Sequence, residues 1–208
     1  IETAENGLVF FKNGDPAYIT KRFDVKEDDS KWAVEDFASL AGRTPQTHGT
    51  DYKYTGSYLE LFELLKKHVP AYRIEAIKLF KLLLFNYLIS NGDAHFKNFS
   101  LIETALGDFK LSPAYDLLNS RIHIDDRGFA LEDGLLPFSK SKGKVTEQFL
   151  KLAELAGISE NQSTKTFQSI TTNRDKVLAL IELSYLEEKT KQNYAQDYQT
   201  KLKKLLRS

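Results

Sequence analysis

A long apolar segment from Arg73 to Ser90 constrains the fold more than any other feature of the sequence. Its apolar residues would lie on almost every side of a helix, which is typical of a helix buried by its neighbours. The length approaches the roughly 20 residues that a membrane span requires. Lys78, Lys81 and Asn86 interrupt the segment, however, and argue against insertion into a bilayer. We therefore predict a buried central helix.

The residues after this helix carry polar side chains at a suggestive spacing. Asn91-Gly92 is a pair suited to the left-handed end of a helix, and it is followed by Asp93-Ala94-His95-Phe96-Lys97-Asn98. Residues 99–102 and 109–111 then predict two short strands joined by a turn. Antiparallel pairing would return the chain to its starting end and bring Asp116, just past the second strand, beside Asn98.

These polar residues are suited to metal binding and proton transfer. An Asn carbonyl and an Asp carboxylate are hard oxygen ligands of the kind that Mg²⁺ prefers, and a separate Asp can take a proton. Taken singly, each of these residues is more often a helix cap or a turn residue. Their joint spacing, the hairpin and the preceding buried helix reverse that preference and predict a site formed by Asp93, Asn98 and Asp116.

The remaining patterns predict an α+β chain that is mainly α. Apolar runs at Leu8 to Lys12 and Ala17 to Phe23, separated by Asn13-Gly14-Asp15-Pro16, predict an antiparallel hairpin. Caps and periodicity predict five further helices and, between the first two, a polar surface loop from Arg43 to Gly56. Two of these helices are expected to begin just after the caps Ser30 and Ser57 and to end near Leu40 and Lys67. The other three are expected over Val145 to Ala156, Ser163 to Leu183 and Leu186 to Leu206.

The motifs resemble those of the HipA-type serine/threonine kinases, the toxin components of bacterial toxin–antitoxin pairs. Residues 93–100 resemble the catalytic loop of that family, and residues 111–118 its metal-binding segment. Residues 18–24 resemble the strand and hinge beside the adenine, and residues 35–38 a helix that follows the hinge. The resemblance implies a protein-kinase-like C-terminal helical lobe at 26–208, preceded at 1–25 by the last β-hairpin of an N-terminal lobe and the hinge.

The resemblance also implies roles for individual residues, with ATP and Mg²⁺ as cofactors. Asp93 would be the catalytic base, and Asn98 and Asp116 would bind the metal. The hinge that meets the nucleotide would be formed by Lys21, Arg22 and Phe23, while the catalytic loop would include His95 and Lys97. Lys97 would neutralise the transferring phosphoryl group. For His95, contact with substrate and a structural hydrogen bond to main chain or Asp116 are both open.

The partners implied by the resemblance are a protein substrate and a small DNA-binding antitoxin. The 29 basic and 29 acidic residues balance, which argues against direct nucleic-acid binding by this lobe and against attraction to an anionic membrane. The absence of cysteine agrees with a cytoplasmic location.

Nothing before Asp93 resembles a glycine-rich phosphate loop, and the sequence opens on Ile1 and contains no Met. We therefore expect a fragment that lacks the phosphate loop. Two alternatives remain. The lobe could be a catalytically incomplete interaction module that binds an antitoxin or target protein, or Asp93, His95 and Asp116 could be ligands of a hydrolytic metal centre.

Overall fold

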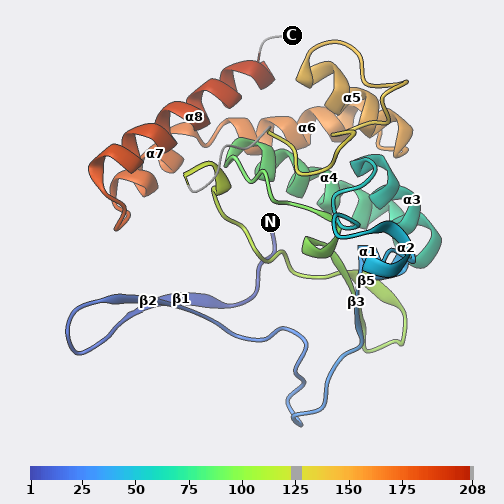
Figure 1. The fold of residues 1–208 in the computed structure, drawn as a ribbon, viewed down its shortest axis with the longest axis horizontal. Coiled ribbons are helices and arrows are strands. Elements are labelled where there is room, and N and C mark those ends of the chain that lie inside the picture. Colours follow the sequence, from blue (N-terminus) through green and yellow to red (C-terminus); the bar gives the residue numbers. More distant parts are fainter. Residues whose placement is uncertain (123–127, 207–208) are drawn as a thin grey trace.

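The computed structural model describes residues 1–122 and 128–206, and its centre is the long helix α4 (Tyr72–Leu88). Leu79, Phe80 and Leu84 in this helix are completely buried. The helices α3 (Tyr58–His68), α6 (Glu160–Thr171) and α8 (Glu188–Leu206) pack around it (Figure 1). The predicted central helix is confirmed. Within the described ranges, no helix combines the length and the apolarity needed to cross a bilayer.

Two small antiparallel sheets accompany the helices. Strands β3 (Val34–Asp36), β4 (Ser100–Glu103) and β5 (Phe109–Leu111) form one sheet, in which Leu101 lies opposite Leu111. The predicted hairpin after residue 98 is therefore present. Strands β1 (Asn6–Phe10) and β2 (Pro16–Thr20) form the other predicted hairpin, a two-stranded ribbon that runs below α7 and α8 in the view of Figure 1.

The helix expected after Ser30 is largely wrong. Residues 34–36 form strand β3, and only the short helix α1 (Phe37–Leu40) follows, with the Asp36 carboxylate accepting a hydrogen bond from the Ser39 main-chain N–H at 2.9 Å. The strand forms because residues 34–36 pair with residues 100–102, and no local pattern reveals that pairing. The polar loop that follows contains one helical turn, α2 (Pro45–His48).

The C-terminal region contains four helices where the sequence predicted three. They are α5 (Val145–Leu155), α6, α7 (Arg174–Glu182) and α8. The predicted helix over 163–183 is interrupted at Thr172 and Asn173, whose side chains turn back onto α6. They donate to the carbonyls of Gln168 and Ser169, each at 2.8 Å, and such bonds compete with helix propagation.

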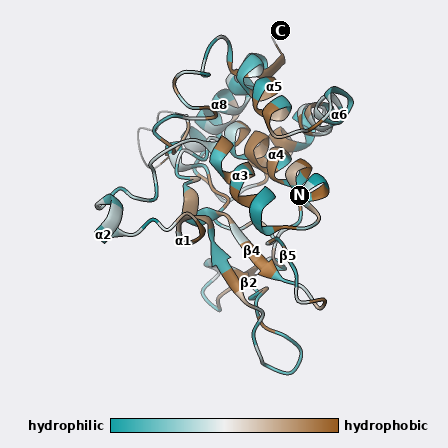
Figure 2. Cartoon of the chain, turned by 90° about the vertical axis from the view of Figure 1, so that its right-hand side faces the viewer, coloured by the Kyte–Doolittle hydropathy of each residue, from teal (hydrophilic) through white to brown (hydrophobic). Residues whose placement is uncertain are grey.

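The core between these helices is rich in aromatic rings. Phe149 on α5 is completely buried and meets the rings of Phe80, Tyr87, Phe129 and Phe167, with centroid separations between 5.7 and 6.2 Å. Figure 2 shows apolar residues concentrated along α4 and on β5. The end of α4 is therefore held rigidly where the polar segment begins.

Candidate active site

Helix α4 ends in a left-handed turn at Ser90, one residue before the pair expected to form it. Ser90 has φ 62°, its N–H donates to the Tyr87 carbonyl at 3.2 Å, and the Asn91 N–H donates to the Asn86 carbonyl at 2.9 Å. This is the pair of bonds that defines a Schellman motif. The expectation that Asn91-Gly92 forms the turn is corrected: Ser90 is the left-handed residue, and Asn91 follows it and closes the motif through its main-chain N–H.

The buried side chain of Asn91 joins three parts of the site. Its Nδ2 donates to Asn86 Oδ1 at 3.0 Å and to the Asp116 carbonyl at 3.1 Å. Its Oδ1 accepts from the Asp93 main-chain N–H at 3.3 Å. One amide therefore ties the end of α4 to both acidic segments.

The hairpin β4–β5 brings Asn98 and Asp116 into contact, as expected. Asn98 Nδ2 donates to Asp116 Oδ2, and Asn98 Oδ1 accepts from the His95 main-chain N–H at 3.0 Å. Asp116 has φ 54°, a left-handed conformation that non-glycine residues seldom adopt outside functional sites and turns. The amide and carboxylate oxygens are an oxygen donor set that fits Mg²⁺. Asn98 and Asp116 are thus the residues that could hold the metal.

The hydrolytic metal centre finds no support in the geometry. Such a centre would gather three or more His, Cys, Asp or Glu side chains, and residues 1–122 and 128–206 contain no such group placed to hold an ion. Asp93 is occupied differently, because its Oδ1 accepts a hydrogen bond from the Tyr54 hydroxyl at 2.8 Å.

Tyr54 is the site residue that the sequence reasoning missed. It lies 39 positions before Asp93, in the loop that was predicted to be a polar surface. Burial, followed by the hydrogen bond to Asp93, raises the pKa of Tyr54 to about 12. Two tyrosines around Lys53, in an otherwise polar loop, are the only sequence signal that pointed to it.

His95 is buried beside Tyr54. Its ring meets the Tyr54 ring edge-on at 5.1 Å, and within the described part of the chain its Nδ1 has no hydrogen-bond partner. Burial is the main cause that lowers the pKa of His95, and the positive charge of Lys53 adds to it. The main chain of His95, through its bond to Asn98, supports the loop.

Lys97 lies on the outer side of the loop. Its Nζ forms an ion pair with Asp36 Oδ2 at 2.9 Å, and this contact raises the pKa of the lysine. The pair joins the segment around Lys97 to the first turn of α1, because Asp36 also caps that helix. Lys97 is therefore oriented toward Asp36 in this structure.

The predicted hinge residues border a cleft of about 350 Å³. Phe23 stacks on Tyr115 at 5.9 Å, and the Tyr115 hydroxyl donates to the Lys97 carbonyl at 2.7 Å. The charged hinge side chains are engaged locally. Lys21 pairs with Glu5 at 3.3 Å, and Arg22 Nε donates to Asp24 at 2.9 Å.

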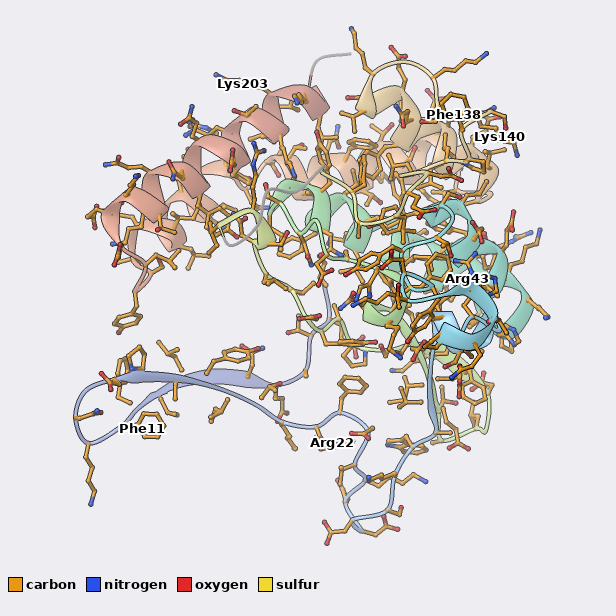
Figure 3. All side chains as sticks on the ribbon, in the orientation of Figure 1. Phe11, Arg22, Arg43, Phe138, Lys140 and Lys203 are labelled. Carbon is orange, nitrogen blue, oxygen red and sulfur yellow. The ribbon has the colours of Figure 1, made fainter. Side chains whose placement is uncertain are left out.

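A second cleft, of about 560 Å³, is lined by Asp116 and by residues of the β1–β2 ribbon. Ala4, Thr20 and Tyr115 border both clefts, so the two are neighbours. The hinge residues thus lie at one end and Asp116 at the other, and Figure 3 shows Arg22 where the chain leaves the ribbon. The volumes are in the range of about 300–1,000 Å³ that is usual for small-molecule sites.

Comparison with known families and sequences identifies the family of this chain. The model of the HipA-like C-terminal domain matches residues 1–178. Two proteins of Sinorhizobium fredii are similar in sequence: "Putative kinase Y4dM" is 34% identical over 145 residues and "Putative kinase Y4mE" is 32% identical over 119. The alignments cover 69% and 54% of this chain but only 32% and 27% of the relatives, so the chain spans about a third of their length.

Solved structures show the same fold. HipA of Shewanella oneidensis, in a complex with HipB and operator DNA, is 21% identical with a TM-score of 0.75, covering 99% of this chain and 52% of that one. The proinflammatory kinase CtkA of Helicobacter pylori is 14% identical with a TM-score of 0.63, covering 98% and 78%. The mostly helical, kinase-like fold with small sheets is thereby confirmed.

Proposed function

Because this chain belongs to the HipA-like C-terminal domain family, we propose that it forms the catalytic part of an ATP- and Mg²⁺-dependent serine/threonine-protein kinase. One observation carries the proposal: Asn98 and Asp116 are in direct contact, and the Asn91 amide joins the Asp116 and Asp93 segments beside a cleft of nucleotide size. This is the order and grouping of residues that phosphoryl transfer uses in protein kinases.

In the proposed reaction, the oxygen of a serine or threonine side chain attacks the γ-phosphorus of ATP. The new oxygen–phosphorus bond forms as the bond to the β-phosphate oxygen breaks, and ADP leaves. Asp93 accepts the proton of the attacking hydroxyl. Mg²⁺ held by Asn98 and Asp116 would neutralise charge on the phosphates.

The other predicted residues have supporting roles in this proposal. The main chain at Lys21, Arg22 and Phe23 would meet the adenine, because these residues border the cleft at the end away from Asp116. His95 supports the loop, since its main chain bonds to Asn98 and its ring packs on Tyr54. Lys97 contacts a phosphate only if it exchanges its bond to Asp36.

We further propose that the natural partners are a protein substrate and a small DNA-binding antitoxin, and that the protein acts in the cytoplasm. The described complex of the Shewanella HipA with HipB and operator DNA supports the antitoxin. The balanced charge of this chain supports contact with DNA through the antitoxin instead of through this lobe.

The interaction-module alternative is favoured by one feature, the exposed apolar surface of the β1–β2 ribbon. Phe10, Phe11 and Ile19 expose 53%, 63% and 53% of their surface. Exposed apolar patches commonly mark protein interaction sites. In that alternative the chain would bind a partner protein without transferring phosphate.

The deciding experiment measures phosphate transfer from labelled ATP with Mg²⁺, by the full-length gene product and by the 208-residue chain. We expect transfer to a protein serine or threonine by the full-length protein. Asp93→Asn should abolish transfer while ATP binding, measured by calorimetry, persists. Asp116→Ala should weaken Mg-ATP binding as well. Transfer at equal rates by wild type and both variants would refute the assignments, and folded protein with no transfer would favour the interaction module.

A further inference from the structure

The segment around Tyr54 is built onto the candidate catalytic loop through its main chain. The Lys53 carbonyl accepts from the Phe96 N–H at 3.1 Å, and the Tyr54 carbonyl accepts from the Glu132 N–H at 3.0 Å. A few residues on, the buried Tyr58 hydroxyl donates to the Ala94 carbonyl at 2.7 Å. The bonds of Lys53 and Tyr58 therefore hold the two segments together at two points, although the segments are far apart in the sequence.

Arg43 fastens the same segment from its other side. Its Nη1 donates to the Thr55 carbonyl at 2.6 Å, and its Nη2 pairs with Glu60 at the start of α3. The guanidinium carbon lies 4.2 Å from the centre of the Phe96 ring, so Arg43 also covers the catalytic loop. The arginine side chain is only 11% exposed, and Figure 3 shows it among the packed side chains around α1.

These contacts hold the Tyr54 hydroxyl beside one carboxylate oxygen of Asp93. Tyr54 donates to Asp93 Oδ1 at 2.8 Å, and its ring is fixed between the edge contact with His95 and Lys53, whose Nζ is 4.8 Å from the ring centre. A carboxylate turns easily about its last torsion, because that torsion is broad. A donor held this firmly limits that rotation.

We propose that Tyr54 is a positioning residue for Asp93. The Tyr54 hydroxyl holds Oδ1 of Asp93 and leaves Oδ2 to take the proton of the serine or threonine that accepts the phosphate. The inference rests on the proposed phosphotransfer reaction. Burial and Asp93 raise the pKa of Tyr54 to about 12. The tyrosine therefore remains a protonated donor throughout the neutral pH range.

A different role for the same contact would be a plug, in which the Tyr54 hydroxyl occupies the place of the acceptor and must leave before substrate binds. The anchoring argues against this role. The carbonyls of Lys53, Tyr54 and Thr55 all accept hydrogen bonds, so that moving the main chain would break all three, and turning the Tyr54 side chain alone would lose its edge contact with His95. A fixed support is the arrangement that these contacts favour.

The test compares Tyr54→Phe with wild type in the full-length protein. Phenylalanine keeps the ring that packs on His95 and removes only the hydroxyl. We expect kcat to fall about tenfold to a hundredfold, as misplacement of a catalytic group does, with the Kd for Mg-ATP unchanged and only a small fall in the thermal midpoint from the lost hydrogen bond. Tyr52→Phe, a hydroxyl deletion in the same loop that leaves the bond to Asp93 intact, should leave kcat unchanged.

Other outcomes overturn the inference. An unchanged kcat would show that the bond does not matter, faster transfer would identify a plug, and phosphate on Tyr54 in a mass spectrum would make it an acceptor.

A double-mutant cycle of Tyr54→Phe and Asp93→Ala in urea unfolding keeps the test independent of activity, because each change removes one partner of the hydrogen bond. Coupling between the two changes establishes the hydrogen bond even if Tyr54→Phe lowers stability, and its absence refutes the bond. If wild type transfers no phosphate, the proposed function and the positioning role fail together, while the cycle still reports the contact.

Discussion

Replacing Asn91 by alanine tests whether one amide holds the two acidic segments together. The substitution removes the bonds to Asn86 Oδ1, to the Asp116 carbonyl and from the Asp93 N–H. Asn91 and Asn86 are 4% and 5% exposed, so water cannot easily replace the lost partner. At about 1 kcal/mol for each neutral hydrogen bond, the three together predict a loss of about 3 kcal/mol in the free energy of unfolding.

Urea unfolding measures this loss directly. With a slope near 3 kcal/mol per molar, which is typical of the larger single domains, the midpoint should fall by about 1 M. Asn173→Ala is the matched control, because its Nδ2 donates to the Ser169 carbonyl at 2.8 Å on an exposed surface. That control should cost less than about 1 kcal/mol. If Asn91→Ala costs no more than Asn173→Ala, the reasoning about the buried amide is wrong.

Three further outcomes are expected. Phe149→Ala should lower the unfolding free energy, measured by thermal unfolding, by about 3–5 kcal/mol, because the ring is fully buried. Phe138→Ala, at an 88% exposed position, should change it little in the same measurement. Lys97→Met should cost less than about 1 kcal/mol in urea unfolding, since the lysine of its pair with Asp36 is 42% exposed; a larger loss would show that the pair is more than a surface contact. Burial lowers the pKa of His95, so the unfolded chain takes up a proton more readily than the folded one, and stability should fall as the pH drops below about 6.5. His95→Gln should reduce that fall in stability. An unchanged pH dependence in this variant would show that His95 does not cause it.

The sequence predicted the parts of the site that depend on local geometry. Asn98 and Asp116 flank a hairpin whose strands and turn are contiguous, and their contact follows from antiparallel pairing. The central helix was equally predictable, because its apolar residues leave no side for water. The helical character of the C-terminal region could also be predicted from its periodicity, whereas the interruption at Thr172 and Asn173 could not.

The misses involve partners that are distant in the chain. Strand β3 was mistaken for part of a helix because its pairing residues lie more than 60 positions later, at 100–102. Tyr54 was overlooked because its loop has the polar composition of solvent-exposed chain, whereas hydrogen bonds made by Arg43 and Tyr58 hold it against residues 93–98. In both cases tertiary contacts outweigh the local preference.

The two walls of the nucleotide-sized cleft belong to regions of very different local stability. Asp116 is exposed but follows strand β5, whose Leu111 is part of the core. Tyr18 and Thr20 belong to the β1–β2 ribbon, and two-stranded ribbons are marginal in water by themselves. The ring of Phe10 meets the ring of Tyr185, in the turn between α7 and α8, edge-on at 5.5 Å. Backbone amides of the ribbon should therefore exchange with solvent far sooner than those of β4, and a ligand that bridges the walls would slow exchange chiefly in the ribbon.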